Sequence, residues 1–154
     1  MEMPSVSEQM QRLTELFVGT WRGEERLFPS EWDPVGGPAT GTWTVRPGAG
    51  GCCLLVEYDE ERAGQVTYRG HGVHGQDARD GRFYAYWFDS LGMMPKAGTP
   101  ATFADDRYTY TEPGPTGQSR FTYAWRDGAF TFTIERARDG VTWAPMHEGT
   151  YRRT

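Results

Sequence analysis

The sequence predicts an all-β protein: a single antiparallel up-and-down β-barrel of about ten strands, with one short N-terminal helix capping an end. Two observations carry this prediction. An amphipathic helical pattern ends at Gly19-Thr20-Trp21-Arg22-Gly23, and no second helical pattern follows. From Thr20 to Arg153 the chain reads as short runs rich in Thr and aromatic residues, each closed by Gly, Pro or Asp-Gly. A barrel of this size has an interior wide enough for its own side chains or for one small ligand.

Length and charge narrow the class of protein. The 154 residues are expected to form one domain, 1–154, and the formal charge of −5 argues against a nucleic-acid partner or an anionic membrane. No apolar run is long enough to span a membrane, and residues 1–18 lack a secretory signal pattern. Cys52 and Cys53 are adjacent, so in a strand they would point to opposite faces and could not form an ordinary disulfide. We therefore expect a cytoplasmic protein.

The helix is expected over about residues 6–18. Ser5 and Glu8 have the spacing of a capping box, and Gly19 stands where a helix commonly ends. Between them the apolar residues fall at helical spacings and form one stripe, made of Val6, Met10, Leu13 and Phe17. A short helix with one apolar face next to a barrel is expected to close one of its ends.

Strands are expected in ten runs between about residues 20 and 152. These are Thr20–Phe28, Thr40–Arg46, Cys52–Glu60, Val66–Gln76, Arg82–Asp89, Thr99–Ala104, Arg107–Glu112, Ser119–Arg126, Ala129–Arg136 and Val141–Arg152. Asp-Gly pairs at 80–81, 127–128 and 139–140 are strong signals for tight hairpins, because both central residues of such a turn must accept a positive φ. Longer loops at 29–39 and 90–97 are expected at the rim, where access to a barrel is controlled.

The last three strands can be aligned from these turns. A two-residue turn at Asp127-Gly128 places Trp125 opposite Phe130. A second one at Asp139-Gly140 places Phe132 opposite His147. One face then carries the large rings, and burying each of them stabilises the fold by roughly 1.5–3 kcal/mol, so this face should point inward and carry His147 with it. Its members are Phe121, Tyr123, Trp125, Phe130, Phe132, Ile134 and Trp143.

Two earlier strands carry the other candidate polar groups. In the run 82–89 the set containing Trp87 and Asp89 has no charge before its end, so it is placed inside. For the run 66–76 two registers remain open: one puts His71 beside Trp87, and a slip of one residue puts His74 there instead. Glu25, Glu148 and Arg120 are read as a surface ion-pair network, on positions that face solvent in this assignment.

Four motifs carry a family resemblance. They are Gly19-Thr20-Trp21-x-Gly23-Glu24-Glu25, Gly70-His71-Gly72-Val73-x-Gly75-x-Asp77, Trp87-Phe88-Asp89-Ser90-x-Gly92, and Asp139-Gly140-x-x-Trp143 with Glu148-Gly149-Thr150-Tyr151-Arg152. With them the chain resembles an uncharacterised bacterial domain-of-unknown-function family of lipocalin-like (calycin-type) β-barrels, and more distantly nitrobindin and the fatty-acid-binding proteins. The resemblance implies that a basic residue, Arg152 or Arg153, packs on Trp21 to close the barrel; Arg152 is the residue assigned.

The resemblance to nitrobindin also implies a haem alternative, with His147 as the iron ligand. Otherwise no cofactor is predicted. His71 and His74 would lie on opposite faces of a strand, so they could not bind one metal ion together. No three nitrogen, sulfur or carboxylate donors have the spacing of a zinc site, and none is predicted.

The leading functional prediction is a carrier or sensor for a small apolar or amphipathic molecule held inside the barrel. Its walls and polar anchors are expected to be Trp87, Tyr123, Trp125, Phe132 and Trp143, with His71, Asp89 and His147. One alternative is a hydrolase- or isomerase-like enzyme in which His71, Asp89 and Glu148 converge, although no catalytic motif is present. Another is a homodimeric interaction module with a filled barrel, suggested by apolar residues on outer positions such as Tyr84, Tyr86 and Phe88.

Overall fold

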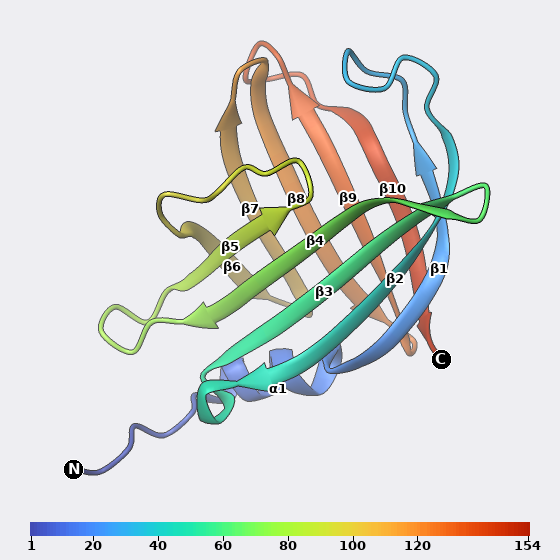
Figure 1. Ribbon diagram of the computed structural model, residues 1–154. Coiled ribbons are helices and arrows are strands. Elements are labelled where there is room, and N and C mark those ends of the chain that lie inside the picture. The colour runs from blue at the N-terminus through green and yellow to red at the C-terminus, as the bar shows by residue number, and fades with distance from the viewer.

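The structure, a computed structural model, describes all residues 1–154 and is a closed ten-stranded antiparallel barrel with one helix. Each strand pairs with the next along the chain, and the last strand pairs with the first (Figure 1). The predicted fold class is confirmed. The elements are α1 (Glu8–Phe17), β1 (Gly19–Leu27), β2 (Gly37–Gly48), a single 3-10 turn (Ala49–Gly51), β3 (Cys53–Arg62), β4 (Gln65–Gln76), β5 (Phe83–Asp89), β6 (Thr99–Ala104), β7 (Arg107–Gly114), β8 (Gly117–Arg126), β9 (Ala129–Ala137) and β10 (Ala144–Arg153).

Helix α1 covers one end of the barrel (Figure 1). It begins slightly later than expected, because Ser7 rather than Ser5 caps it: the Ser7 hydroxyl accepts the Met10 amide at 3.1 Å. Its buried face carries Met10, Leu13 and Phe17, as the apolar stripe predicted. The structure contains no helix long and apolar enough to cross a lipid bilayer.

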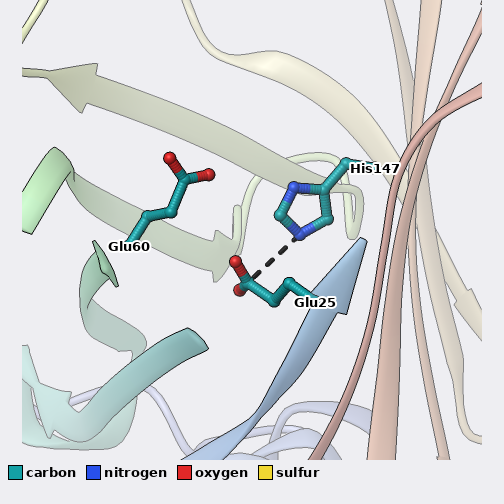
Figure 2. A group of neighbouring side chains, drawn as sticks. All are labelled: Glu25, Glu60 and His147. Atoms are coloured by element: carbon teal, nitrogen blue, oxygen red, sulfur yellow. Dashed lines mark ion pairs between the residues drawn. The ribbon is translucent and has the colours of Figure 1, made fainter. Parts of the chain in front are cut away.

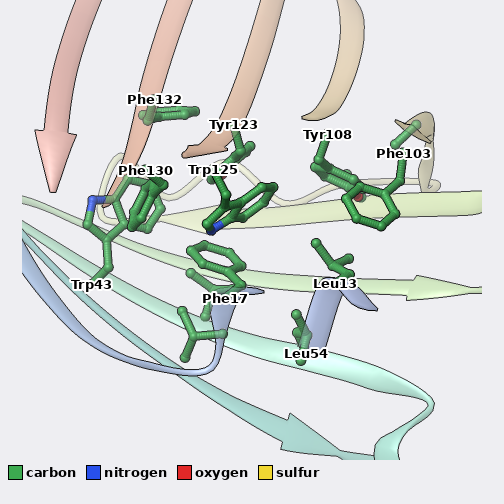
Figure 3. Close-up of a cluster of buried hydrophobic side chains, with 14 of the residues drawn as sticks. Leu13, Phe17, Trp43, Leu54, Phe103, Tyr108, Tyr123, Trp125, Phe130 and Phe132 are labelled. Carbon is green, nitrogen blue, oxygen red and sulfur yellow. The ribbon is translucent and has the colours of Figure 1, made fainter. Parts of the chain in front are cut away.

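The half of the barrel next to α1 is filled by aromatic rings (Figure 3). Phe17 enters from the helix and packs edge-on against Trp125 and Phe130, with ring centroids 5.1 and 5.2 Å apart. Such edge-to-face pairs are worth about 0.5–1.5 kcal/mol each beyond the burial of their area. Above this layer Tyr123 and Phe132 approach Trp43 from the opposite wall. The helix therefore seals the barrel with a ring of its own.

The hairpin of β8 and β9 has the predicted register. Trp125 lies opposite Phe130, and Tyr123 lies opposite Phe132. The ring-bearing face of these strands points inward, as predicted.

The predicted register of β9 with β10 is wrong. His147 lies opposite Ile134 rather than Phe132, because residues 138–143 form a longer connection and a bulge separates Pro145 from His147. The Asp139 carboxylate accepts the amides of Val141 and Thr142, which holds this connection away from a two-residue turn. His147 still faces inward, since its partner Ile134 does.

On β4 the register with His74 inside is the one adopted. Gly72 lies opposite Trp87 and His74 opposite Ala85, so His71 faces outward. The glycines beside His71 therefore do not leave open space around its ring. They make room inside the barrel for Trp87: a Cβ on Gly70 would lie 2.0 Å from Cζ2 of that indole.

Arg153, not Arg152, packs on Trp21. Its guanidinium carbon lies 4.3 Å from the centre of the indole ring, and its nitrogens donate to the carbonyls of Leu16 and Val18 at the end of α1. Trp21 in turn donates from Nε1 to the Phe17 carbonyl at 2.8 Å. Arg152 is the wrong choice, because it lies opposite Arg22, whose neighbour Trp21 points to the other face.

Candidate functional site

A cavity of about 450 Å³ occupies the half of the barrel away from α1. Its mouth is formed by the connection between β1 and β2, which contributes Trp32 and Asp33, and by the connection between β5 and β6, which contributes Leu91 and Met93. Both loops were expected at the rim. Trp32, Leu91 and Met93 are largely exposed, so the mouth has an apolar edge.

The cavity walls are mainly aromatic. They are formed by Trp43, Tyr58, Tyr68, Trp87, Tyr110, Phe121, Tyr123 and Phe132. Some of these rings form hydrogen bonds through their polar atoms, and others do not. Trp87 donates from Nε1 to the Tyr68 hydroxyl at 2.7 Å, and Tyr68 donates to Asp89 at 3.2 Å. Trp43 Nε1 and the Tyr123 hydroxyl have no hydrogen-bond partner.

Behind one wall lies Glu25, whose side chain is completely buried. The Tyr58 hydroxyl donates to the Glu25 carboxylate and lies 2.7 Å from one of its oxygens and 2.8 Å from the other. The Tyr151 hydroxyl donates to Oε1 of Glu25 at 2.7 Å. Burial, and then the Glu25 charge, raise the pKa of both tyrosines far above the ordinary value of 10, so they remain donors at neutral pH. A Cβ on Gly41 would lie 1.9 Å from Oε1 of Glu25, so the strand β2 leaves room for this carboxylate.

Two further ionisable groups approach Glu25 at the cavity wall (Figure 2). Nε2 of His147 lies 3.6 Å from Oε1 of Glu25 and 3.4 Å from the Tyr151 hydroxyl. Glu60 accepts the Thr67 hydroxyl at 3.0 Å. The donor atoms of Glu25, Glu60 and His147 all lie within 4.8 Å of one another, and all three residues are buried.

Near the mouth, Arg62 is held by carboxylates. Its guanidinium lies 2.6 Å from Asp33 and 3.6 Å from Glu60. The hydrogen bond from Arg62, with help from the Gly36 amide, lowers the pKa of Asp33. The cavity wall also contains Asp89 and Glu112, which accept hydrogen bonds from the hydroxyls of Tyr68 and Thr99. Arg62 is thus the one permanent cation among several carboxylates in the cavity lining.

A family model described as "Protein of unknown function (DUF1579)" matches residues 7–153, which is nearly the whole chain. The chain belongs to this family. The barrel is also similar to a solved structure described as the crystal structure of Rv2717c from M. tuberculosis. The two share 12% sequence identity with a TM-score of 0.71, over 97% of this chain and 99% of that one. This likeness establishes the fold, which is consistent with a calycin-type barrel. A search of curated protein sequences gives no match.

In this DUF1579 chain, five of the residues expected to bind a ligand line the cavity together. They are Trp87, Asp89, Tyr123, Phe132 and His147. Trp125 also points inward, but it lies outside the cavity lining, where Phe17 packs against it.

His71 and Trp143 are not at the cavity. His71 faces outward and pairs with Glu57, because its strand adopts the other register. Trp143 lies in the connection before β10 and stacks on the outer side chain of Arg120, with the guanidinium carbon 4.1 Å from the ring centre. Both therefore have to be removed from the predicted set of ligand contacts.

The structure also separates the alternatives. His71, Asp89 and Glu148 do not converge: Glu148 is exposed and Asp89 lines the cavity, so the predicted enzyme-like triad is wrong. The interaction-module alternative required a barrel filled by its own side chains, whereas the structure contains a cavity. A porphyrin bound through Nε2 of His147 would need the space occupied by the Glu25 carboxylate and the Tyr151 hydroxyl, so these residues do not fit haem.

The sequence did not predict that Glu25 and Glu60 belong to the site. Glu25 was assigned to a surface network with Arg120, yet Arg120 pairs with Glu135 at 3.0 Å and Glu25 lies inside. The signal that could have found it is the two-residue period of β1. Glu25 is four residues after Trp21, so if Trp21 is inside, Glu25 must share its face.

Proposed function

We propose that this DUF1579 protein binds one small amphipathic molecule, neutral or cationic, inside the barrel. The observation that carries the proposal is the cavity of about 450 Å³ with aromatic walls and a polar wall at His147 and Glu60. Pockets that bind small molecules typically measure ~300–1,000 Å³ and combine apolar walls with a few placed polar groups. The apolar part of the ligand would pack against the rings, and its polar end would face the carboxylates.

The charges of the cavity favour a ligand without a negative charge. Arg62 is already engaged by Asp33 and Glu60, and neither Asp89 nor Glu112 forms an ion pair with a cation. A carboxylate ligand would therefore add a like charge in a partly desolvated space, which costs free energy. An ammonium group would instead be attracted by these carboxylates and by the faces of Trp43 and Trp87.

A matched set of probes tests this proposal. Decylamine, decanol and decanoate have chains of the same length but different charge, and binding of each can be measured by calorimetry on the full chain. We expect decylamine and decanol to bind in a one-to-one ratio, and decanoate to bind at least about tenfold more weakly, a difference of ~1.4 kcal/mol.

A cavity-filling variant provides the structural control. Ile134→Trp places an indole in the cavity lining and should abolish binding of decanol. Val141→Trp adds the same side chain at an exposed position away from the cavity and should leave binding unchanged. If no apolar probe binds the wild-type chain, or if Ile134→Trp binds as well as wild type, the proposed function is wrong.

A further inference from the structure

We propose that Glu25, Glu60 and His147 form a binding site for one divalent transition-metal ion, with a coordination position that opens to the cavity. This inference goes beyond the binding of an amphipathic molecule, since neither property requires the other. The three residues come from β1, β3 and β10, which are far apart in the sequence, and the closed barrel brings them to one place (Figure 2).

The spacing of the donor atoms suits a small ion. In a tetrahedral site with metal–ligand bonds of about 2.0–2.1 Å, the ligand atoms stand about 3.4 Å from one another. Nε2 of His147 and Oε1 of Glu25 are already 3.6 Å apart. The Glu60 carboxylate lies within 4.8 Å of both, and a rotation of its side chain would close the remaining gap.

His147 is a second observation that points to a ligand. It is 95% buried, yet the contacts of Nε2 are long: its hydrogen bond with the Tyr151 hydroxyl measures 3.4 Å, and Glu25 lies at 3.6 Å. Hydrogen bonds of nitrogen to oxygen usually measure about 2.7–3.2 Å. A buried polar atom without a good partner requires an explanation. Nε2 is directed at Glu25, where a bound ion would provide that partner (Figure 2).

The surroundings support carboxylates in a ligating role. The hydroxyls of Tyr58 and Tyr151 donate hydrogen bonds to Glu25, and the Thr67 hydroxyl donates one to Glu60. Metal-ligating carboxylates are commonly oriented by such donors around them. Two buried carboxylates also bring two negative charges close together. Arg62 lies 3.6 Å from Glu60, but no arginine or lysine pairs with Glu25, so a divalent cation would compensate the negative charge that remains.

The donor set indicates which ions would bind. One imidazole nitrogen with two carboxylate oxygens suits Zn²⁺, Co²⁺, Mn²⁺ or Fe²⁺, whereas Ca²⁺ and Mg²⁺ prefer oxygen ligands alone. Three protein ligands leave one position open, as in zinc sites that bind water or substrate. Because Glu60 and His147 line the cavity, that position faces the cavity.

Metal binding to the tag-free full chain tests the site. The chain is first stripped with a chelator and then dialysed against Zn²⁺, and bound zinc is counted by atomic emission. Co²⁺ is added separately, because its visible absorption reports a tetrahedral environment. We expect one Zn²⁺ per chain, with the affinity lowered at least about tenfold in both His147→Gln and Glu60→Gln.

Matched controls separate this site from other donors. His71→Gln removes an exposed histidine, and the double variant Cys52→Ser/Cys53→Ser removes both free thiols; each should keep the ion. Circular dichroism checks that every variant folds, and if His147→Gln does not fold, Glu60→Gln decides. The inference is overturned if wild type binds no Zn²⁺ or Co²⁺, if Glu60→Gln binds as tightly as wild type, or if either control loses the ion. Decanol binding to the metal-free chain reports separately on the proposed function.

Discussion

The Glu25 carboxylate occupies the space that a side chain at Gly41 would need: a Cβ on Gly41 would lie 1.9 Å from Oε1 of Glu25 and 2.8 Å from the Tyr151 ring. Real Cβ atoms do not approach other atoms this closely, so position 41 has no side chain where the carboxylate lies. The buried carboxylate is thus accommodated by a neighbouring strand as well as hydrogen-bonded by two tyrosines. The absence of a side chain at position 41 is as much a part of the site as Glu25 itself.

Gly41→Ala should destabilise the protein by about 1–3 kcal/mol, because the added methyl group overpacks the space that Glu25 fills. Urea unfolding followed by fluorescence measures the change in unfolding free energy. Gly114→Ala is the control, since a Cβ there would meet only the Gly117 carbonyl, at 3.6 Å. Equal stabilities of the two variants would show that the Glu25 carboxylate is not fixed in this position.

Tyr58→Phe should lower the unfolding free energy by about 1.5–3 kcal/mol, because it removes a hydroxyl that donates to a buried carboxylate. In a double-mutant cycle with Glu25→Gln, the two substitutions should couple, since the cost of the missing hydroxyl is smaller beside a neutral amide. Tyr86→Phe, at an exposed residue, should change stability by less than about 0.5 kcal/mol. Additive effects of Tyr58→Phe and Glu25→Gln would contradict a charge-assisted contact.

Stability should fall in mild acid because of His74. Burial lowers the pKa of His74 from 6.5 to about 4. Between these values the unfolded chain binds a proton on His74 and the folded chain does not, so the stability present above pH 6.5 is lost as the pH falls toward 4. The loss attributable to this group is about 3 kcal/mol.

Denaturant titrations between pH 4 and 7 measure this dependence. His74→Phe should flatten the profile in this window. A wild-type slope retained in His74→Phe would show that another group is responsible.

Arg153→Ala should destabilise the protein by about 1–2 kcal/mol, because the side chain stacks on Trp21 and binds carbonyls at the end of α1. Arg152→Ala removes the same charge from the neighbouring position and should change stability by less than about 0.5 kcal/mol. Thermal unfolding of the two variants compares them directly. A larger effect at Arg152 would reverse the assignment of the residue that closes the barrel.

The strongest sequence predictions were those with a short, countable turn. Asp127-Gly128 joins two strands with no spare residue, so the pairing of Trp125 with Phe130 and the inward face of both strands followed from parity alone. The helix stripe ending in Phe17 was equally readable, because three apolar positions at helical spacing can face only one way.

The errors arose where the length of the connection between two strands could not be read from the sequence, so that the alternation of inward and outward residues could not be carried across it. The side chain of Asp139 binds two amides and turns Asp139-Gly140 into part of a longer connection, which moved Trp143 to the outside. On β4 no turn could be counted, so the choice between His71 and His74 stayed open until the strands were paired.

The polar part of the site was the least predictable. Glu25, Glu60 and His147 meet only because β1, β3 and β10 curve around one interior, and no spacing along the chain records that meeting. A glutamate in a strand ordinarily suggests a solvated position, and Gly41, which makes the buried position tolerable, lies on a different strand.

The pairing of β1 with β10 has a consequence for biosynthesis. Until residues 144–153 leave the ribosome, strands β1 and β9 each lack a hydrogen-bonding neighbour, and the nascent sheet has two open edges that can join those of another copy. Until that point Glu25 also lacks the hydrogen bond that the Tyr151 hydroxyl donates to it. The closed barrel can therefore form only after β10 has been made, because β10 pairs with both β1 and β9.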